Sequence, residues 1–181
     1  MGQKYAAYDA NGNITAFYDS VDSPVPAGTN VIEITDVQWQ ACLSMPGYTV
    51  QNELLVPPSE AQLLVQAQEA QIARLSQACA NAIVSGFTSD ALGSAYTYPS
   101  TPTDQMNQAT IAQSSSGGLL WCEAAGSWAM KSHTQAQAQA VVASFSAWLN
   151  KCQQQLVSLV AQVNAATTVS AVQAIAWTNP Q

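Results

Sequence analysis

The sequence predicts an α+β protein. A small N-terminal β-rich module at residues 1–57 precedes a mainly helical domain at residues 58–181, which carries two β-hairpins and a long C-terminal heptad helix. Three observations favour this fold class: an Asn-Gly pair between two aromatic runs near the start, a Pro57-Pro58 break, and an apolar heptad pattern that continues to Val163.

The N-terminal module begins with a predicted hairpin. Alternating aromatic runs flank Asn11-Gly12, a dipeptide that readily adopts the positive φ of a two-residue primed turn. Residues 31–34 follow as a short apolar strand. Thr35 and Gln38 then form a capping box, which predicts a short helix that ends at Pro46.

A long helix opens the second domain. Ser59 and Gln62 form another capping box, and the helix is expected to run to about residue 85, with Gly86 as its C-terminal cap. Gln68 interrupts the apolar face of this helix, so its first half is expected to stand free of a core. The apolar face consists of Leu64, Ile72, Leu75, Cys79 and Ile83.

Two hairpins and a short helix are predicted next. Residues 87–92 and 95–98 flank Gly93-Ser94, which suits a two-residue turn. Residues 103–114 read as a helix with Met106, Ala109 and Ile111 partly inward. Residues 119–123 and 127–131 form the second hairpin, with Gly126 left-handed and Trp121 paired with Trp128 across it.

The C-terminal helix has the clearest periodicity in the chain. Its capping box begins at Thr134, and its apolar residues then recur in steps of four and three. The seam is Ala138, Val142, Phe145, Leu149, Cys152, Leu156, Leu159 and Val163. It predicts either a core helix of a bundle or an oligomer interface. A final helix at residues 170–176 is expected to fold Trp177 back onto the core.

The composition limits the classes of partner. Charged residues make up only 8 % of the chain, against about a quarter in an average protein, and the net charge is −7. Because phosphate binding needs clustered Lys and Arg, we expect no nucleic-acid partner and no anionic membrane surface. We expect neither a signal peptide nor a membrane span, since no apolar run approaches about 18 residues. The low charge fits a surface solvated by Gln, Ser and Asn, or one that lies against other subunits.

The pattern of reactive residues predicts no reaction centre. His133 is the only histidine, and no Ser, Cys or carboxylate stands at a triad spacing, so its ring is expected to bond nearby backbone. Asp104 and Asn107 suit cap and turn positions, and nothing beyond their existence supports Asp104 and Glu123 as a glycan-hydrolysing pair. We therefore predict no enzyme activity, no metal site and no cofactor.

The four cysteines lie far apart and lack the spacing of a metal site. We expect four reduced core thiols, in keeping with synthesis in a reducing cytoplasm. They are Cys42, Cys79, Cys122 and Cys152.

Several short pieces of the N-terminal module occur together in a fixed order. They are Tyr5-Ala6-Ala7-Tyr8-Asp9, Asn11-Gly12, Phe17-Tyr18-Asp19, Pro26-Ala27-Gly28, Ile32-Glu33-Ile34-Thr35 and Gln38-Trp39-Gln40. As a set they resemble the N-terminal segment of tailed-bacteriophage tail proteins, both fibre-associated and fibre-assembly proteins. This resemblance implies a role in the tail.

The second domain carries an ordered set of pieces of its own. They are Gly86-Phe87-Thr88-Ser89-Asp90-Ala91-Leu92-Gly93, Tyr96-Thr97-Tyr98, Asp104-Gln105-Met106-Asn107, His133-Thr134-Gln135-Ala136-Gln137, Ala165-Ala166-Thr167-Thr168 and Ile175-Ala176-Trp177. These pieces resemble DUF4376, a domain of unknown function found in phage and prophage proteins. The resemblance implies a virion or virion-assembly role. Gln108 departs from the apolar residue usual at its position, which bears on how that helix packs.

The resemblances together lead to a functional expectation. The chain is expected to be a non-enzymatic phage tail protein, a structural or adaptor component that attaches or extends fibres through protein–protein contacts. The alternatives are a tail-fibre assembly chaperone and, more weakly supported, a receptor-binding tip. The expected location is the virion tail, after synthesis in the host bacterial cytoplasm.

The expected partners are other tail or fibre proteins and further copies of the chain, with a trimer as the expected oligomer because fibres are commonly three-fold. Nucleic acid and membrane are not expected partners. The predicted interface residues are Tyr5, Tyr8, Phe17, Tyr18, Val142, Phe145, Leu149 and Leu156.

Overall fold

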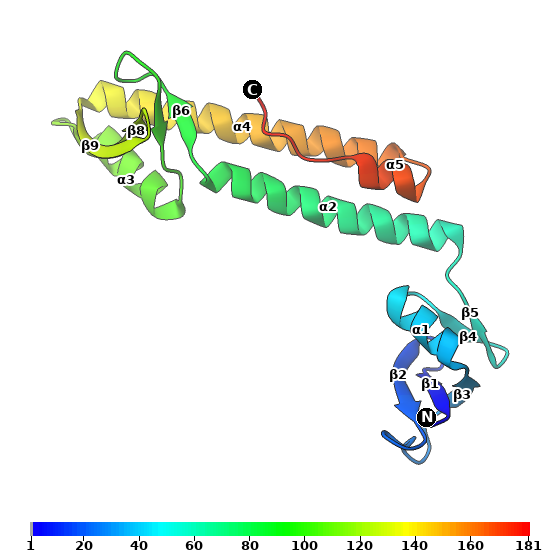
Figure 1. Cartoon of the computed structure of the whole chain (residues 1–181). Coiled ribbons are helices and arrows are strands. Elements are labelled where there is room, and N and C mark those ends of the chain that lie inside the picture. Colours follow the sequence, from blue (N-terminus) through cyan, green and yellow to red (C-terminus); the bar gives the residue numbers. More distant parts are fainter. Residues whose placement is uncertain (1) are drawn as a thin grey trace. The chain divides into compact units, whose positions relative to one another are not determined.

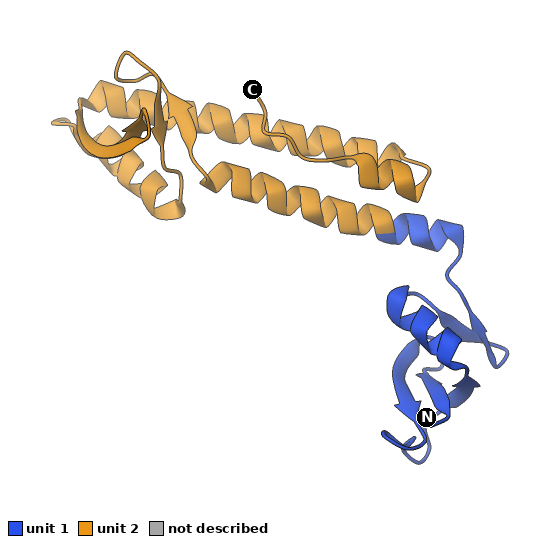
Figure 2. Ribbon diagram, viewed as in Figure 1, with its two compact units in different colours: residues 1–66 blue, residues 67–181 orange. Residues whose placement is uncertain are grey.

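The computed structural model describes residues 2–181 and confirms the predicted α+β class. The chain divides into two compact units, residues 1–66 and residues 67–181 (Figure 2). The division falls inside helix α2 (Glu60–Val84). The predicted domain limits, 1–57 and 58–181, remain predictions about which parts of the chain fold independently.

The first unit is built on an antiparallel sheet with the strand order β2-β1-β3 (Figure 1). Its elements are β1 (Lys4–Tyr8), β2 (Ile14–Asp19), β3 (Val31–Ile34), α1 (Asp36–Ser44), β4 (Thr49–Gln51) and β5 (Leu54–Val56). The capping box of Thr35 and Gln38 starts α1 as predicted. Four buried apolar residues form the core: Ala6, Ile32, Ile34 and Val50.

The loop of the first hairpin is longer than the sequence predicted. The strands are separated by Asp9 to Asn13, and Gly12 donates its N–H to the Asp9 carbonyl at 2.9 Å. The Asp9 carboxylate accepts from the N–H groups of Asn11 and Asn13, at 2.9 Å each. These bonds organise a wider loop in which only Gly12 has a positive φ, 81°. A Cβ at Gly12 would lie 2.3 Å from the Val50 carbonyl oxygen, so only glycine fits there.

The primed turn occurs instead in a hairpin that the sequence did not predict. Strands β4 and β5 pair around Asn52 and Glu53, whose φ angles are 50° and 61°. Two consecutive positive φ angles are the mark of a type I′ turn. Strand β4 has only three residues, which is too short for a periodicity signal.

The second unit contains two long antiparallel helices, α2 from residue 67 onward and α4 (Gln135–Ala165), which lie side by side (Figure 1). The Ser59–Gln62 and Thr134–Gln137 capping boxes start these helices as predicted. Trp148 donates from Nε1 to the Ala82 carbonyl at 3.2 Å, and the Cys79 thiol donates to the Cys152 carbonyl at 3.6 Å. The short helix α5 (Val169–Ala174) follows, and Trp177 packs back onto the cluster around Cys79.

The expectation that the first half of α2 stands free of a core is wrong for the part within this unit. Gln68 donates its amide N–H groups to the carbonyls of Val163 and Ala166, at 3.1 and 3.2 Å. Gln71 is buried and donates to the carbonyl of Ile175. The glutamine that interrupts the apolar pattern therefore binds carbonyls at the C-terminal end of α4, one in its last turn and one at its C-cap, Ala166.

A four-stranded antiparallel sheet completes the unit, and it contains the two predicted hairpins. Its strands, in the order β6-β7-β8-β9, are β6 (Phe87–Ser89), β7 (Tyr96–Tyr98), β8 (Gly118–Ala124) and β9 (Ser127–His133). The hairpins meet at one residue pair, Thr97 with Glu123. The first hairpin has a loop of residues 90–95 rather than two residues, because Ala91 and Leu92 leave the strand and pack against the core.

Helix α3 (Pro102–Gln113) and the first half of α4 pack with the sheet. The core here is Phe87, Tyr98, Ala112, Leu120, Cys122, Ala138 and Val141. The prediction that Met106 points inward is wrong, since Met106 is 67 % exposed. Gln108 and Ala112, one helical turn apart, are the buried residues of α3, and Gln108 donates to the Pro99 carbonyl at 2.7 Å.

Candidate functional site

The four predicted interface residues of the first hairpin divide between the two faces of the sheet. Tyr8 and Phe17 pack against the core of the unit. Tyr5 and Tyr18 lie directly opposite each other in the register of β1 and β2, and both are half-buried. Because successive side chains of a strand alternate, the Tyr5–Tyr18 pair projects from the face opposite the core.

The four predicted interface residues of α4 are all half-buried. Val142 and Phe145 pack against the core of the sheet, and the Phe145 ring lies 5.4 Å from that of Phe87. Leu156 packs on the cluster around Cys79 and Cys152. Much of the seam therefore contacts its own chain, and the interface role of Val142, Phe145, Leu149 and Leu156 stays a prediction.

A more exposed apolar surface lies on the second hairpin. Leu119, Trp121, Trp128 and Met130 are 46–59 % exposed, whereas their neighbours Leu120 and Cys122 are buried. We call these four residues the outer face of the β8–β9 hairpin. Trp121 lies opposite Met130, and Trp128 lies opposite Glu123. The two indoles are therefore diagonal neighbours, and the expected direct Trp121–Trp128 pair is not formed.

The sequence predicts the hairpin but not the exposure of its outer face. The signal was the alternation of residues 119–123, in which Leu119 and Trp121 occupy the positions that alternate with Leu120 and Cys122. Alternation alone cannot tell which face is covered. The packing of Leu120 and Cys122 against α3 and α4 decides it.

Two hollows lie along this outer face. One, of about 320 Å³, is lined by Pro99, Asp104, Trp121 and Trp128. The other, of about 240 Å³, shares Pro99, Asp104 and Trp121 and extends between α3 and the hairpin to Met130. The hairpin face and the start of α3 thus form one continuous surface.

The carboxylates of this surface each hold a local turn. Asp104 accepts with Oδ2 from the N–H of Thr101 at 3.1 Å, which completes the capping box of α3. Glu123 accepts with Oε1 from the N–H of Gly126 in the hairpin turn. Within residues 2–181, Asp104 Oδ1 and Glu123 Oε2 take part in no hydrogen bond. Each carboxylate therefore keeps one oxygen available to a ligand.

His133 is buried beneath the hairpin with Tyr98. Its Nδ1 donates to the carbonyl of Lys131 at 2.9 Å, the kind of backbone bond expected from the sequence. A carbonyl can only accept, so Nδ1 carries a proton, and in the neutral imidazole Nε2 accepts from the Tyr98 hydroxyl at 2.8 Å. Burial raises the pKa of Tyr98. Gly117 is required beside this pair, because its φ is +69° and a Cβ would lie 2.0 Å from the His133 carbonyl oxygen.

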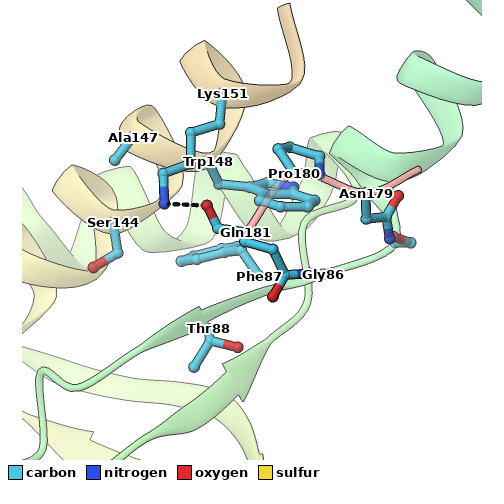
Figure 3. Close-up of a pocket in the computed structure, with 11 residues that line it drawn as sticks. Gly86, Phe87, Thr88, Ser144, Ala147, Trp148, Lys151, Asn179, Pro180 and Gln181 are labelled. Carbon is cyan, nitrogen blue, oxygen red and sulfur yellow. Dashed lines mark hydrogen bonds between the residues drawn. The ribbon is translucent and has the colours of Figure 1, made fainter. Parts of the chain in front are cut away.

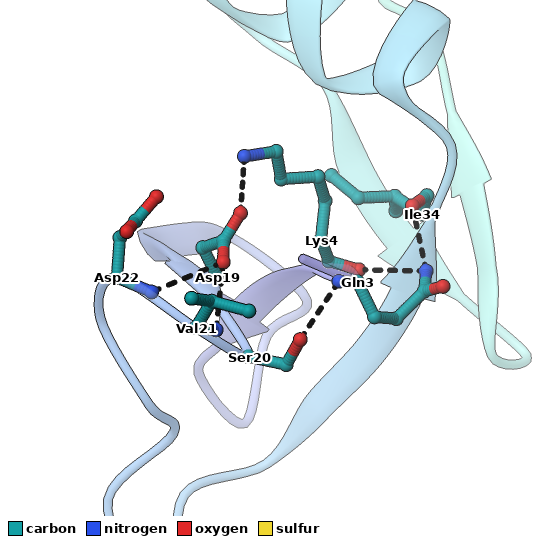
Figure 4. A network of polar contacts seen from close by, with 7 residues as sticks. All are labelled: Gln3, Lys4, Asp19, Ser20, Val21, Asp22 and Ile34. Atoms are coloured by element: carbon teal, nitrogen blue, oxygen red, sulfur yellow. Dashed lines mark hydrogen bonds and ion pairs between the residues drawn. The ribbon is translucent and has the colours of Figure 1, made fainter. Parts of the chain in front are cut away.

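The first unit has a charged network at the sheet (Figure 4). Lys4 donates to Asp19 in an ion pair, and Asp19 also accepts from the N–H groups of Val21 and Asp22, at 2.8 and 3.2 Å. The bond from Lys4, with these backbone donors, lowers the pKa of Asp19 to about 2. The same contact raises the pKa of Lys4, whose Nζ lies 4.5 Å from the centre of the Trp39 ring.

A hollow of about 430 Å³ opens beside α4, and Phe87, Trp148 and Pro180 form its walls (Figure 3). Lys151 donates to the carbonyl of Gln181 at 2.9 Å across it. The ammonium group of Lys151, the one basic side chain that lines this hollow, is therefore already bonded to a main-chain carbonyl. Its lining offers fewer exposed aromatic rings than the outer face of the β8–β9 hairpin.

The cysteines are free thiols. Cys79, Cys122 and Cys152 are buried, and Cys42 is half-buried. Burial raises the pKa of all four. In the part of the chain that the structure describes, no three His, Cys, Asp or Glu side chains are grouped closely enough to hold a metal ion, and no helix has the length and hydropathy to cross a membrane.

Comparison with known families gives one match. The model of DUF4376, a domain of unknown function, matches residues 66–176. This range contains α3, α4, α5, the four-stranded sheet and most of α2. No curated protein and no solved structure matches the chain.

Proposed function

The chain belongs to the DUF4376 family, and on this premise we propose that it is a non-enzymatic component of a phage tail, an adaptor that attaches or extends tail fibres through protein–protein contacts. The resemblance of its N-terminal segment to tail proteins supports the tail location. Synthesis would take place in the host bacterial cytoplasm.

The outer face of the β8–β9 hairpin is the observation that carries the adaptor role. Exposed Trp and Met side chains grouped on one face mark interaction surfaces, since monomeric proteins seldom leave such groups in water. Trp residues in particular supply a large part of the binding energy where proteins meet. The Tyr5–Tyr18 pair offers the first unit a second aromatic contact surface.

The charge of the chain supports protein partners over nucleic acid or membrane. Its net charge is −7, with four basic residues. We propose other tail or fibre proteins as partners, together with further copies of the chain, as a trimer. Light scattering coupled to gel filtration tests the trimer, which has a mass of three 19.1 kDa chains. A mass of one chain across micromolar concentrations would contradict self-association.

Quantitative mass spectrometry of purified virions, produced by the strain that encodes the chain, tests the tail role. An adaptor appears at a fixed ratio to the major tail proteins. A fibre-assembly chaperone is absent from purified virions or present only in traces. The same result for this chain would overturn the structural role. Adsorption to cells that is lost while particles keep their full composition would favour the receptor-binding tip.

A matched pair of variants tests the surface. Trp128→Ser removes an indole from the outer face of the hairpin, and Val157→Ser removes an apolar group that is 71 % exposed on α4. We expect Trp128→Ser to lower the amount of the chain in virions and Val157→Ser to leave it unchanged. Equal amounts of both variants in virions would show that the hairpin is not the contact surface.

A further inference from the structure

We propose that the hollow lined by Pro99, Asp104, Trp121 and Trp128 binds an arginine side chain of a partner protein. This inference rests on the proposed function only for the statement that the occupant belongs to another protein of the assembly. The chemistry of the lining points to a cation.

Three of the four residues that line the hollow, Asp104, Trp121 and Trp128, favour positive charge. Indole rings carry negative charge on their faces and attract cations, most strongly among the aromatic side chains. Trp121 and Trp128 are about half exposed, so their rings are accessible. Asp104 adds a carboxylate whose Oδ1 has no hydrogen-bond partner within residues 2–181. Glu123 lies opposite Trp128 in the hairpin and adds a second carboxylate to the same face.

Within residues 67–181, the protein supplies no cation to this surface. The basic residues of this unit are Arg74, Lys131 and Lys151, and none of them lines either hollow of the outer face. Lys131 belongs to β9 but lies opposite the buried Leu120, on the other face of the hairpin, with its Nζ 5.2 Å from the centre of the Tyr96 ring. The negative potential of the outer face is therefore left for a partner to neutralise.

Arginine fits the lining better than lysine or a sugar. A guanidinium is planar, so it stacks on an indole while its N–H groups reach a carboxylate. Sugar binding needs hydrogen-bond donors as well as acceptors, and among the four lining residues only the indole N–H groups can donate. A second copy of the chain is a poor occupant, because it has one arginine, Arg74, and carries a net charge of −7.

The test is an NMR titration of the ¹⁵N-labelled full chain with N-acetyl-arginine methylamide. The probe should shift the indole N–H signals of Trp121 and Trp128, which the Trp121→Phe and Trp128→Phe variants assign. The neutral near-isostere, N-acetyl-citrulline methylamide, should bind about tenfold more weakly. Raising the salt concentration should weaken the arginine probe, because its binding is partly electrostatic.

Two charge variants make the test specific. Asp104→Asn removes the carboxylate but keeps an oxygen that can accept from Thr101, and it should weaken the arginine probe several-fold. Asp22→Asn removes the same charge in the other unit and should leave the affinity unchanged. Equal binding of arginine and citrulline, larger indole shifts with N-acetylglucosamine, or no effect of Asp104→Asn would each overturn the proposal.

The outcome is independent of the virion experiment. Selective arginine binding by a chain that is absent from virions would refute the tail-adaptor role and leave the cation site standing. A chain present at fixed ratio whose indole signals ignore arginine would refute the cation site alone.

Discussion

Glutamine amides in this protein form long-range hydrogen bonds to main-chain carbonyls, a role that charged side chains often have in other proteins. Gln68, Gln71 and Gln108 each donate to a main-chain carbonyl far away in the sequence or at the end of another element. Such residues cannot be placed from sequence alone. A glutamine on an apolar stripe looks like an interruption, and only the position of the distant carbonyl shows that it is a contact.

The Tyr98–His133 pair gives the first prediction at this scale. Tyr98→Phe removes the hydroxyl that donates to His133 Nε2, and both residues are buried, at 0 % and 1 % exposure. The unpartnered acceptor should lower the free energy of unfolding by about 1–3 kcal/mol. Urea denaturation measures it. The half-buried Tyr96→Phe is the control, and an equal loss there would show that the pair is unimportant.

Asp19 gives a prediction about pH. The pKa of Asp19 in the folded protein, about 2, lies below its ordinary value of 3.8. Ionised Asp19 therefore stabilises the fold above about pH 4, and this contribution is lost as the pH falls towards about 2. Asp19→Asn should lower the Tm of the first unit at pH 7, and its Tm should meet that of the wild type near pH 2.

The Trp39 indole signal in NMR spectra follows this melting, because Lys4 contacts that ring and Trp39 is the one tryptophan of residues 1–66. Glu33→Gln, at an exposed carboxylate of β3, is the matched control. A Tm difference between Asp19→Asn and wild type that stays constant from pH 7 to pH 2 would contradict the ion pair as its cause.

At the scale of elements, helix starts were more predictable than hairpin loops. Each of the capping boxes that begin at Thr35, Ser59 and Thr134 spans four consecutive residues, so neighbouring residues alone determine its geometry. The loop at residues 9–13 depends instead on the Asp9 carboxylate and on Val50, which is distant in the chain. The loop at residues 90–95 depends on the core that Ala91 and Leu92 reach.

The two faces of α4 give a prediction about stability. Val163 is 0 % exposed and Val157 is 71 % exposed, and both lie in the same helix. Val163→Ala should lower the free energy of unfolding by about 2 kcal/mol, because it removes two buried methyl groups and leaves a cavity in their place. Val157→Ala should change the free energy of unfolding by less than about 0.5 kcal/mol.

Denaturant midpoints, read at constant m-value, separate these two substitutions. Val157→Ala is the control for Val163→Ala, since both substitutions remove the same atoms and only the burial of the side chain differs. If Val157→Ala costs as much as Val163→Ala, the exposed side of α4 must be covered in solution, which would point to self-association through this helix.

For the whole molecule, the structure supports a prediction about autonomous folding. The second unit has long paired helices and a sheet core, whereas the core of the first unit comprises four small or medium residues. We expect the fragment 59–181 to melt cooperatively alone. The fragment 1–57 should be less ordered than the fragment 1–66, because it lacks the buried Pro58 and Gln66, whose amide lies against Gly47.

Circular dichroism melts of the three fragments decide this. A cooperative melt of the fragment 1–57, together with no cooperative melt of 59–181, would contradict the prediction that the second part of the chain is the one that folds alone. The sequence could supply a β-rich module followed by a helical part because its turn and cap signals are local, whereas the two compact units divide inside α2, between residues 66 and 67. It could not supply the outer face of the β8–β9 hairpin, because that depends on which side α3 and α4 cover.

The thiols have a consequence for the chemical ageing of the protein. Attack by peroxide or by a disulfide requires a thiolate, and burial raises the pKa of Cys79, Cys122 and Cys152 while also blocking access. At neutral pH these three sulfur atoms are therefore poor substrates for oxidation in air. Cys42, the half-buried thiol of α1, is where oxidative modification should begin when the protein is stored without reductant.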